Sequence, residues 1–256
     1  MSKTIIFIHG MACGAWSWDG YKDFFEKKGY KCIVPDLRYH NSGPLAEPDP
    51  RLGTTGILDF ADDLEKEIKS LKEIPILIGH SMGGLLAQTL AGRGLASAAV
   101  LLCPAPPRGI IGMRWSVIQV FLNIVTKWGW WKKPFRFSFD RIRRTALPST
   151  PVDDLKKAFG KMVSESGQAL FEISCYFLDS KRATEVNAEN IKCPMLIISG
   201  KQDKIMPASV VRNIAKKYSA KADYLELDNH SHWIIGETGW QDVAQKINEW
   251  LNNCST

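Results

Sequence analysis

The chain of 256 residues is long enough to bury one full-sized hydrophobic core, and one core with one insertion fits that length better than two independent domains. Its composition, 45% hydrophobic and 23% charged residues, excludes a disordered, a collagen-like or a disulfide-stapled protein. The net charge is +6, and residues 104–190 alone account for it, with 14 Lys and Arg against 8 Asp and Glu.

Short apolar runs alternate with amphipathic stretches along most of the chain, which predicts an α/β protein with a mostly parallel sheet. The runs are rich in Ile, Val and Leu, as expected for strands covered by helices on both faces. In chain order, we expect six strands, over Thr4–Ile8, Cys32–Val34, Pro75–Ile78, Ala98–Leu102, Met195–Ile198 and Asp223–Leu227. We expect core helices over Tyr21–Lys28, Asp59–Leu71, Met82–Arg93, Pro207–Tyr218 and Asp242–Leu251.

Between residues 104 and 190 this alternation stops, and the sequence contains no convincing strand. Helical spacing predicts three helices here, over roughly Ile110–Trp128, Val152–Val163 and Gln168–Leu178. The first of them has an unusually wide apolar face. We therefore expect an all-helical insertion, residues 104–190, in an α/β core formed by residues 1–103 and 191–256.

The beginning of the sequence and its cysteines bear on the compartment. Near the start, only four apolar residues, Ile5 to Ile8, precede His9, too few for the core of a signal peptide. No apolar run is long enough to cross a bilayer. The six cysteines form no CxxC pair and no metal-ligand spacing. We therefore expect reduced thiols in a cytoplasmic protein.

The run Gly79-His80-Ser81-Met82-Gly83 follows an apolar strand and leads into a helical run. In that context a G-x-S-x-G run predicts a turn so tight that neighbours two residues away crowd the serine, and glycine at 79 and 83 removes the side chains that would clash. The helix that starts at the serine contributes free N–H groups and a dipole that favour a developing negative charge. Ser81 is therefore the predicted nucleophile, and an ordinary glycine turn is the alternative.

A serine nucleophile needs a base, which is usually histidine. The chain has five histidines. We expect structural roles for His9 and His80, and a loop position for His40. This leaves His230 and His232, which both follow the last predicted strand.

Three stretches resemble the α/β-hydrolase superfamily. His232-Trp233-Ile234-Ile235-Gly236-Glu237 resembles its histidine loop, in which a bulky residue and, five positions on, an acid follow the base. The resemblance therefore favours His232 over His230. The strand Met195–Ile198 with the turn that ends at Asp203 resembles the superfamily's acid loop, and Cys103 to Pro107, the other place for the acid, contains no carboxylate. Asp203 as a simple turn cap is the alternative.

The third stretch, His9-Gly10-Met11-Ala12-Cys13-Gly14-Ala15-Trp16-Ser17-Trp18, closely resembles the oxyanion loop of plant-type esterases and related hydroxynitrile lyases. This resemblance implies that the backbone N–H groups of Met11 and Met82 bind the oxyanion. It covers residues 1–103 and about 191–256, whereas the insertion matches no family that we can name. It implies an α/β-hydrolase fold with a helical cap, residues 104–190, over the serine.

The expected activity is serine-dependent hydrolysis of carboxylic esters with an apolar acyl or alcohol part, through an acyl-enzyme. Ser81 excludes the aspartate-nucleophile branches, and Trp233 stands where hydroxynitrile lyases carry lysine. Carbon–carbon bond hydrolases and cofactor-free haloperoxidase-like members share the triad and remain alternatives, as does a non-catalytic binding protein of the same fold. No metal or organic cofactor is suggested.

The insertion is basic and rich in tryptophan. Residues 108–147 contain a single acid, Asp140, and four of the nine tryptophans, Trp115, Trp128, Trp130 and Trp131. Their nine basic residues are Arg108, Arg114, Lys127, Lys132, Lys133, Arg136, Arg141, Arg143 and Arg144. We favour a buried apolar cap face with a solvated basic rim. The alternative is weak contact with an anionic membrane surface, and no nucleic-acid partner is expected because no recognisable module accompanies the basic run.

Overall fold

The computed structural model describes residues 2–41, 43–112, 114–143 and 152–254. Six strands form one parallel sheet in the order β2-β1-β3-β4-β7-β8. They are β1 (Thr4–Ile8), β2 (Lys31–Ile33), β3 (Ile76–His80), β4 (Ala98–Leu102), β7 (Met195–Gly200) and β8 (Ala222–Leu227). The six predicted strands are confirmed, with bounds that shift by at most two residues.

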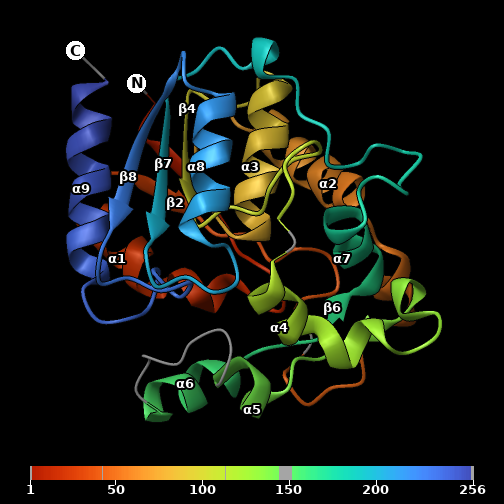
Figure 1. Cartoon of the computed structure of the whole chain (residues 1–256). Helices are drawn as coiled ribbons and strands as arrows, with labels where there is room; N and C mark the ends of the chain where they lie inside the picture. The colour runs from red at the N-terminus through yellow and green to blue at the C-terminus, as the bar shows by residue number, and fades with distance from the viewer. Residues whose placement is uncertain (1, 42, 113, 144–151, 255–256) are drawn as a thin grey trace.

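Helices cover both faces of the sheet (Figure 1). They are α1 (Asp19–Lys27), α2 (Ile57–Lys69), α3 (Met82–Gly92), α8 (Ala208–Lys217) and α9 (Trp240–Asn253). Side chains of α2, α3 and α8 pack with Ile6 and Ile8 of β1 in one apolar cluster, and those of α1 and α9 pack with Ile5 and Phe7 in another. Because both faces are covered, every residue of β1 is apolar or buried.

Most of the insertion lies beyond the carboxyl ends of the strands, and its last residues run back to their amino ends (Figure 1). It contains α4 (Trp115–Val125), α5 (Phe139–Arg141), α6 (Val152–Phe159) and α7 (Gly167–Ser174). It also contains β5 (Pro134–Phe135) and β6 (Glu165–Ser166), which pair antiparallel. The expectation of an all-helical insertion was therefore wrong, because two-residue strands are too short to leave an alternating pattern in the sequence. Short 3₁₀ turns occupy Ala15–Trp18, Pro50–Thr54, Trp130–Lys132 and Ala188–Asn190.

The first helix of the insertion is shorter than predicted. It begins at Trp115 instead of near Ile110 and ends at Val125. The preceding Gly109 adopts φ +93°, a left-handed conformation that a helix cannot contain, and Gly129 adopts φ +75° beyond its end. Within the described ranges, none of the helices combines the length and apolar character that crossing a bilayer requires.

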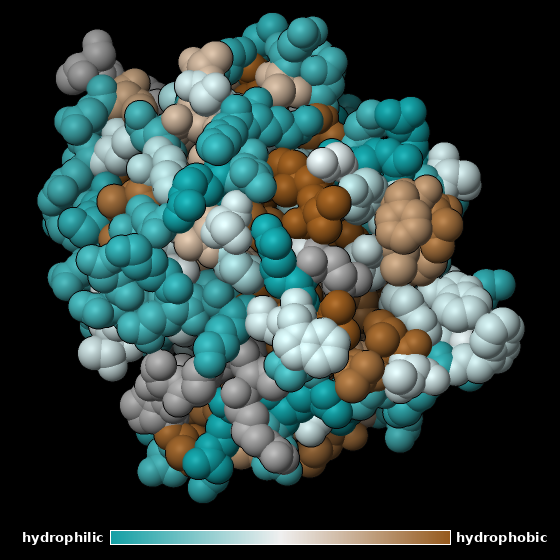
Figure 2. All heavy atoms as spheres, in the orientation of Figure 1, coloured by the Kyte–Doolittle hydropathy of each residue, from teal (hydrophilic) through white to brown (hydrophobic). Residues whose placement is uncertain are grey.

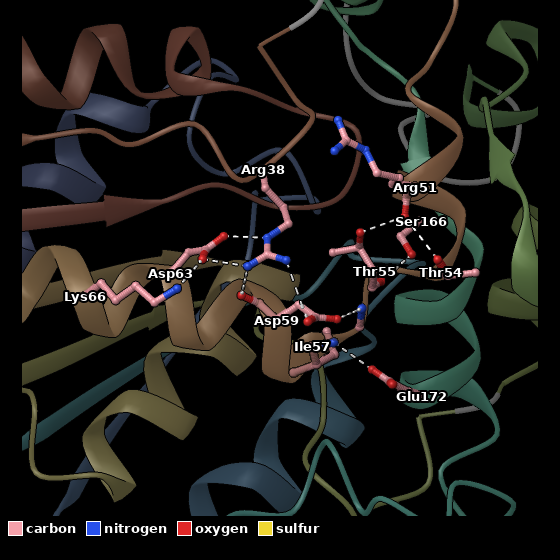
Figure 3. A network of polar contacts seen from close by, with 11 residues as sticks. Arg38, Arg51, Thr54, Thr55, Ile57, Asp59, Asp63, Lys66, Ser166 and Glu172 are labelled. Atoms are coloured by element: carbon pink, nitrogen blue, oxygen red, sulfur yellow. Dashed lines mark hydrogen bonds and ion pairs between the residues drawn. The ribbon is translucent and has the colours of Figure 1, made fainter.

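Polar contacts attach the insertion to the start of α2 (Figure 3). The Ser166 hydroxyl donates to the Thr55 carbonyl at 2.6 Å, and the buried Glu172 carboxylate accepts the N–H of Ile57 at 2.7 Å. On the other side of α2, Arg38 binds Asp63 through two hydrogen bonds.

A second attachment is a buried ion pair. Glu165 of β6 accepts a hydrogen bond from His40 Nε2 at 3.1 Å, and both side chains are fully buried. The other ring nitrogen of His40 donates to the Arg38 carbonyl at 3.0 Å, so both nitrogens face acceptors, as in the protonated ring. Burial alone would lower the pKa of His40, but the charge of Glu165 and the hydrogen bond to it leave the pKa above its ordinary value of 6.5.

The same pair lowers the pKa of Glu165. Burial alone would raise this pKa, but His40 and the N–H groups of Ser166 and Ala12 leave it below its ordinary value of 4.5. The stabilisation from the pair is therefore complete between pH 4.5 and pH 6.5. It is lost as the pH rises through the raised pKa of His40, or falls through the lowered pKa of Glu165.

This linkage predicts a pH-dependent effect of His40→Gln. At about pH 5.5 the substitution should lower the free energy of unfolding by about 3 kcal/mol, because it leaves the charge of Glu165 buried without its partner. The difference in unfolding free energy between the two proteins should narrow as the pH is raised towards about 9, because native His40 loses its proton as the pH rises through its pKa. Urea unfolding at both pH values measures this. Lys22→Gln, which breaks an exposed ion pair with Glu26, is the control and should show little change at either pH. A difference that stays constant with pH would contradict the charged pair.

Candidate active site

Ser81 lies in a strained turn between β3 and α3. Its backbone adopts φ +53° and ψ −117°, a conformation that side-chain-bearing residues rarely occupy. The turn requires glycine at two positions, since a Cβ on Gly79 would lie 2.2 Å from the Gly83 oxygen and one on Gly83 would lie 2.1 Å from the Ile8 oxygen. The Ser81 N–H donates to the Leu102 carbonyl at 3.0 Å, which ties the turn to β4.

Ser81, His232 and Asp203, the three predicted catalytic residues, lie together. The distance from His232 Nε2 to Ser81 Oγ is 3.1 Å, and that from His232 Nδ1 to Asp203 Oδ2 is 2.7 Å. The second oxygen of Asp203 accepts the N–H groups of Ile205 at 2.8 Å and Met206 at 2.7 Å. The carboxylate is thereby fixed by the backbone, and it orients the imidazole towards Ser81.

The other candidate base, His230, lies elsewhere. Its Nδ1 is 3.0 Å from Glu237 Oε1, and the same carboxylate accepts the N–H of Ser231 at 2.8 Å. Glu237, five positions after His232, therefore shapes the loop that carries the imidazole. His80 supports the same loop by donating from Nε2 to the His232 carbonyl at 2.8 Å. Burial, together with the neighbouring His232, lowers the pKa of His80 to about 3, so it is a neutral donor.

The loop after β1 packs against Ser81. A Cβ on Gly10 would lie 3.0 Å from Ser81 Cβ. The Gly10 carbonyl accepts hydrogen bonds from His9 Nδ1 at 2.9 Å and from the N–H of Cys13 at 3.3 Å. These two hydrogen bonds fix the Gly10–Met11 peptide. Because this peptide is trans, the N–H of Met11 points opposite to the Gly10 carbonyl.

The two predicted oxyanion donors are both available. Within the described ranges, neither the N–H of Met11 nor that of Met82 donates to a protein atom. Met82 is the first residue of α3, where backbone N–H groups have no partner inside the helix. Two free N–H groups beside a serine hydroxyl are the donors that a tetrahedral oxyanion requires.

Two functional candidates were not anticipated from the sequence. Glu165 Oε2 accepts the N–H of Ala12 at 2.8 Å, next to the predicted donor Met11, and His40 is the partner of that carboxylate instead of an ordinary loop residue. Glu165 lies 153 positions from Ala12, and no motif joins the two. The available signal was weak: Glu165 is one of only eight acids in the basic insertion.

A cavity of about 450 Å³ reaches from Ser81 and His232 into the insertion. Its walls are almost entirely apolar, and no Asp, Glu, Lys or Arg among the described residues lines it. Side chains from α4, α6 and α7 contribute much of its wall, including Val117, Val120, Phe121, Leu155, Phe159 and Leu170. The cavity is therefore suited to an uncharged, apolar group attached to the reacting carbon.

One cluster has the spacing of metal ligands. Atoms of Cys103, Asp203 and His232 lie within 4.8 Å of one another. Burial, followed by the charge of Asp203, raises the pKa of the Cys103 thiol, whereas a thiolate is the form that binds metals. Asp203 already bonds to His232, and His232 bonds to Ser81 through its other ring nitrogen. The cluster fits a proton relay better than a metal centre.

Comparisons with known proteins agree with this geometry. Residues 5–246 match the model of the alpha/beta hydrolase family. The bovine Protein ABHD8 (Bos taurus) is 24% identical over 250 residues, which cover 91% of this chain and 52% of that protein. The AB hydrolase superfamily protein YisY of Bacillus subtilis (strain 168) is 26% identical over 258 residues, covering 92% of this chain and 87% of that protein. The chain thus spans about half the length of ABHD8.

Solved structures share the fold. A methylesterase, MES16 from Arabidopsis, superposes with a TM-score of 0.72 at 16% identity, covering 97% of this chain and 98% of that one. A pyrethroid hydrolase from Sphingobium faniae JZ-2 superposes with a TM-score of 0.70 at 17% identity and covers 98% of both chains. The fold class predicted from the sequence is confirmed. Because the family model matches nearly its whole length, the chain belongs to the alpha/beta hydrolase family.

Proposed function

We propose that the protein is a serine hydrolase that cleaves carboxylic esters with an apolar acyl or alcohol part. The observation that carries this proposal is the hydrogen-bonded series Ser81 Oγ, His232 and Asp203 at one end of an apolar cavity. A hydroxyl in hydrogen-bond reach of an imidazole, which a buried carboxylate orients in turn, is the arrangement that activates serine as a nucleophile.

The geometry supports a two-step reaction. His232 takes the proton of Ser81 while Oγ attacks the ester carbonyl, and Asp203 stabilises the imidazolium that forms. The oxyanion accepts hydrogen bonds from the N–H groups of Met11 and Met82. His232 then gives its proton to the leaving alcohol, and a water activated by His232 hydrolyses the acyl-enzyme.

We expect Ser81→Ala and His232→Ala to abolish turnover of p-nitrophenyl esters, because each removes a group that acts in the transition state. Asp203→Asn should lower kcat by about 10³- to 10⁴-fold, because the amide supports the wrong imidazole tautomer. Steady-state kinetics on folded variants measure these losses.

The matched control is His230→Ala, which removes the neighbouring imidazole that bonds Glu237 rather than Ser81. It should retain activity within about tenfold of the native protein. Full activity of Ser81→Ala would overturn the proposal. A native protein that is folded but inert on every ester would instead favour a carbon–carbon bond hydrolase or a binding protein of the same fold.

The cavity volume bears on the size of the apolar group. About 450 Å³ lies within the range of about 300 to 1,000 Å³ that small-molecule sites occupy, so the cavity can hold a long apolar chain. The absence of Asp, Glu, Lys and Arg from the described lining disfavours a charged substituent inside the cavity. A neutral ester with one long aliphatic chain fits both observations.

Activity should therefore rise with acyl chain length. We expect kcat/KM for p-nitrophenyl esters to increase by up to about fourfold per methylene, the equivalent of about 0.8 kcal/mol, and to level off once the chain fills the cavity. Ala158→Phe, which fills part of the cavity, should shorten the optimum and leave the acetyl ester unaffected. Ala220→Phe, an exposed position outside the cavity, is the control. An optimum at acetyl in the native protein would contradict the long-chain substrate.

We also propose that the insertion contacts an anionic lipid surface, from which such a substrate would enter. Within the described residues, six of the eight exposed large hydrophobic side chains belong to the insertion: Ile111, Trp115, Leu122, Trp128, Phe177 and Leu178. Ile111 and Phe177 also line the cavity. Hydrophobic side chains gather over α4 and the chain before it, on the face towards the viewer in Figure 2.

Basic side chains accompany this apolar surface. Arg114, Lys127, Lys132 and Lys133 are exposed, and none of them has an acidic partner among the described residues. Arg144, the ninth basic residue of the segment, lies outside the described residues. Unpaired cations beside exposed tryptophans are suited to a surface of anionic headgroups. Each cation near such a membrane contributes about 1 kcal/mol to the binding free energy.

Vesicle flotation tests this contact. The protein should bind phosphatidylcholine vesicles that contain phosphatidylglycerol, and binding should weaken as salt is added. The double variant Trp115→Ala/Trp128→Ala, at positions 71% and 89% exposed, should lose most of the binding. Ile74→Ala, an exposed apolar position of the core at 52%, is the control. Lack of binding to anionic vesicles, or binding that the double variant retains, would overturn the proposal.

A further inference from the structure

Both peptide groups of Ala12 are bonded to the insertion. Its N–H donates to Glu165 Oε2 at 2.8 Å, and its carbonyl accepts the N–H of Val163 at 2.9 Å. Ala12 directly follows Met11, whose N–H is one of the two proposed oxyanion donors. Two residues of the insertion, Val163 and Glu165, therefore hold the core loop at the position next to that donor.

Ala12 depends on such contacts for its conformation. Its φ is +57°, a left-handed value that alanine adopts at a penalty of about 1 kcal/mol or more. Residues in this region keep their conformation only when surrounding contacts impose it. If Glu165 released the N–H of Ala12, the Met11–Ala12 peptide could rotate. Met11 joins this peptide to the one that carries the proposed donor N–H, so Met11 would then be held on its Gly10 side only.

The carboxylate of Glu165 is itself held at both oxygens. Oε1 accepts the N–H of Ser166 at 2.6 Å, and Oε2 is shared between Ala12 and His40. His40 in turn contacts the ring of His9, with centroids 5.2 Å apart, and His9 bonds the Gly10 carbonyl. One buried set of contacts thus reaches from the insertion to both sides of the Met11 donor.

We propose that Glu165 is a positioning residue for the oxyanion hole: from the insertion, it holds the Met11–Ala12 peptide so that the N–H of Met11 faces the developing oxyanion. This inference rests on the proposed serine hydrolase function. It means that the core alone carries Ser81, His232 and Asp203, while the oxyanion hole is complete only with the insertion in place.

The experiment compares two buried glutamates of the insertion. Glu165→Gln removes the charge and one of the two acceptor oxygens that hold the N–H groups of Ala12 and Ser166. Glu172→Gln makes the same change at the acceptor for Ile57, at the start of α2 and outside the cavity lining. We expect Glu165→Gln to lower kcat by about 10- to 100-fold with little change in KM, because the donor acts mainly in the transition state. Glu172→Gln should keep kcat within about twofold of the native protein.

A pair of inhibitors distinguishes a loss of positioning at the oxyanion hole from a general distortion of the cavity. A long-chain trifluoromethyl ketone is attacked by Ser81 Oγ, the serine proton passes to His232, and the carbonyl oxygen becomes an oxyanion in the hole. The corresponding methyl ketone fills the same cavity with little adduct formation. In Glu165→Gln, affinity for the trifluoromethyl ketone should fall by the same factor as kcat/KM, and affinity for the methyl ketone should stay within about twofold.

Each outcome decides the inference. Equal losses for both ketones, or an unchanged kcat in folded Glu165→Gln, would overturn it. If Glu165→Gln does not fold, His40→Gln gives the same comparison, because it loosens Glu165 without removing the acceptor for Ala12. If the ratio of the affinities for the trifluoromethyl ketone and the methyl ketone is unchanged in His40→Gln, the inference is also overturned. Loss of the inference alone would leave Ser81→Ala inactive, whereas failure of the proposed function would leave Ser81→Ala active.

Discussion

The rest of the site depends on the steric constraint at Ser81. A backbone with φ +53° between a buried strand and a buried helix can exist only because glycine at 79 and 83 lets the two segments approach within van der Waals contact. The constraint lifts the serine above the carboxyl edge of a parallel sheet, where the loops after the other strands also end. Asp203 after β7 and His232 after β8 reach Ser81 for that reason.

Residues whose position follows from local sequence were predictable. The six strands alternate with helices in a simple order, so an acid after β7 and a histidine after β8 had to lie on the same edge of the sheet as Ser81. The choice of His232 over His230 came from a family resemblance, and the contacts agree with it: Glu237, the acid of that pattern, bonds His230 and Ser231 and leaves His232 facing Ser81.

Features that depend on long-range contacts were not predictable. The strands β5 and β6 are two residues each and exist through their pairing with one another and their contact with residues 50–54. Glu165 and His40 are separated by 125 positions, and neither stands in a motif. The expected helix over Ile110–Trp128 covers only Trp115–Val125, and the two glycines with left-handed φ, Gly109 and Gly129, lie just outside the expected range.

The charge of Glu165 explains why His40 has to be its partner. A lone carboxylate one peptide unit from the oxyanion donor would oppose the negative charge that develops there, and it would also be destabilising in a buried place. A protonated His40 balances that charge while leaving the carboxylate free to accept the N–H of Ala12. Burial, followed by the neighbouring His40, lowers the pKa of His9 to about 4, so His9 stays neutral. The Gly10 carbonyl that His9 holds next to Met11 therefore faces no extra cation. The buried pair thus holds the N–H of Ala12 without placing a net charge beside the proposed oxyanion donor.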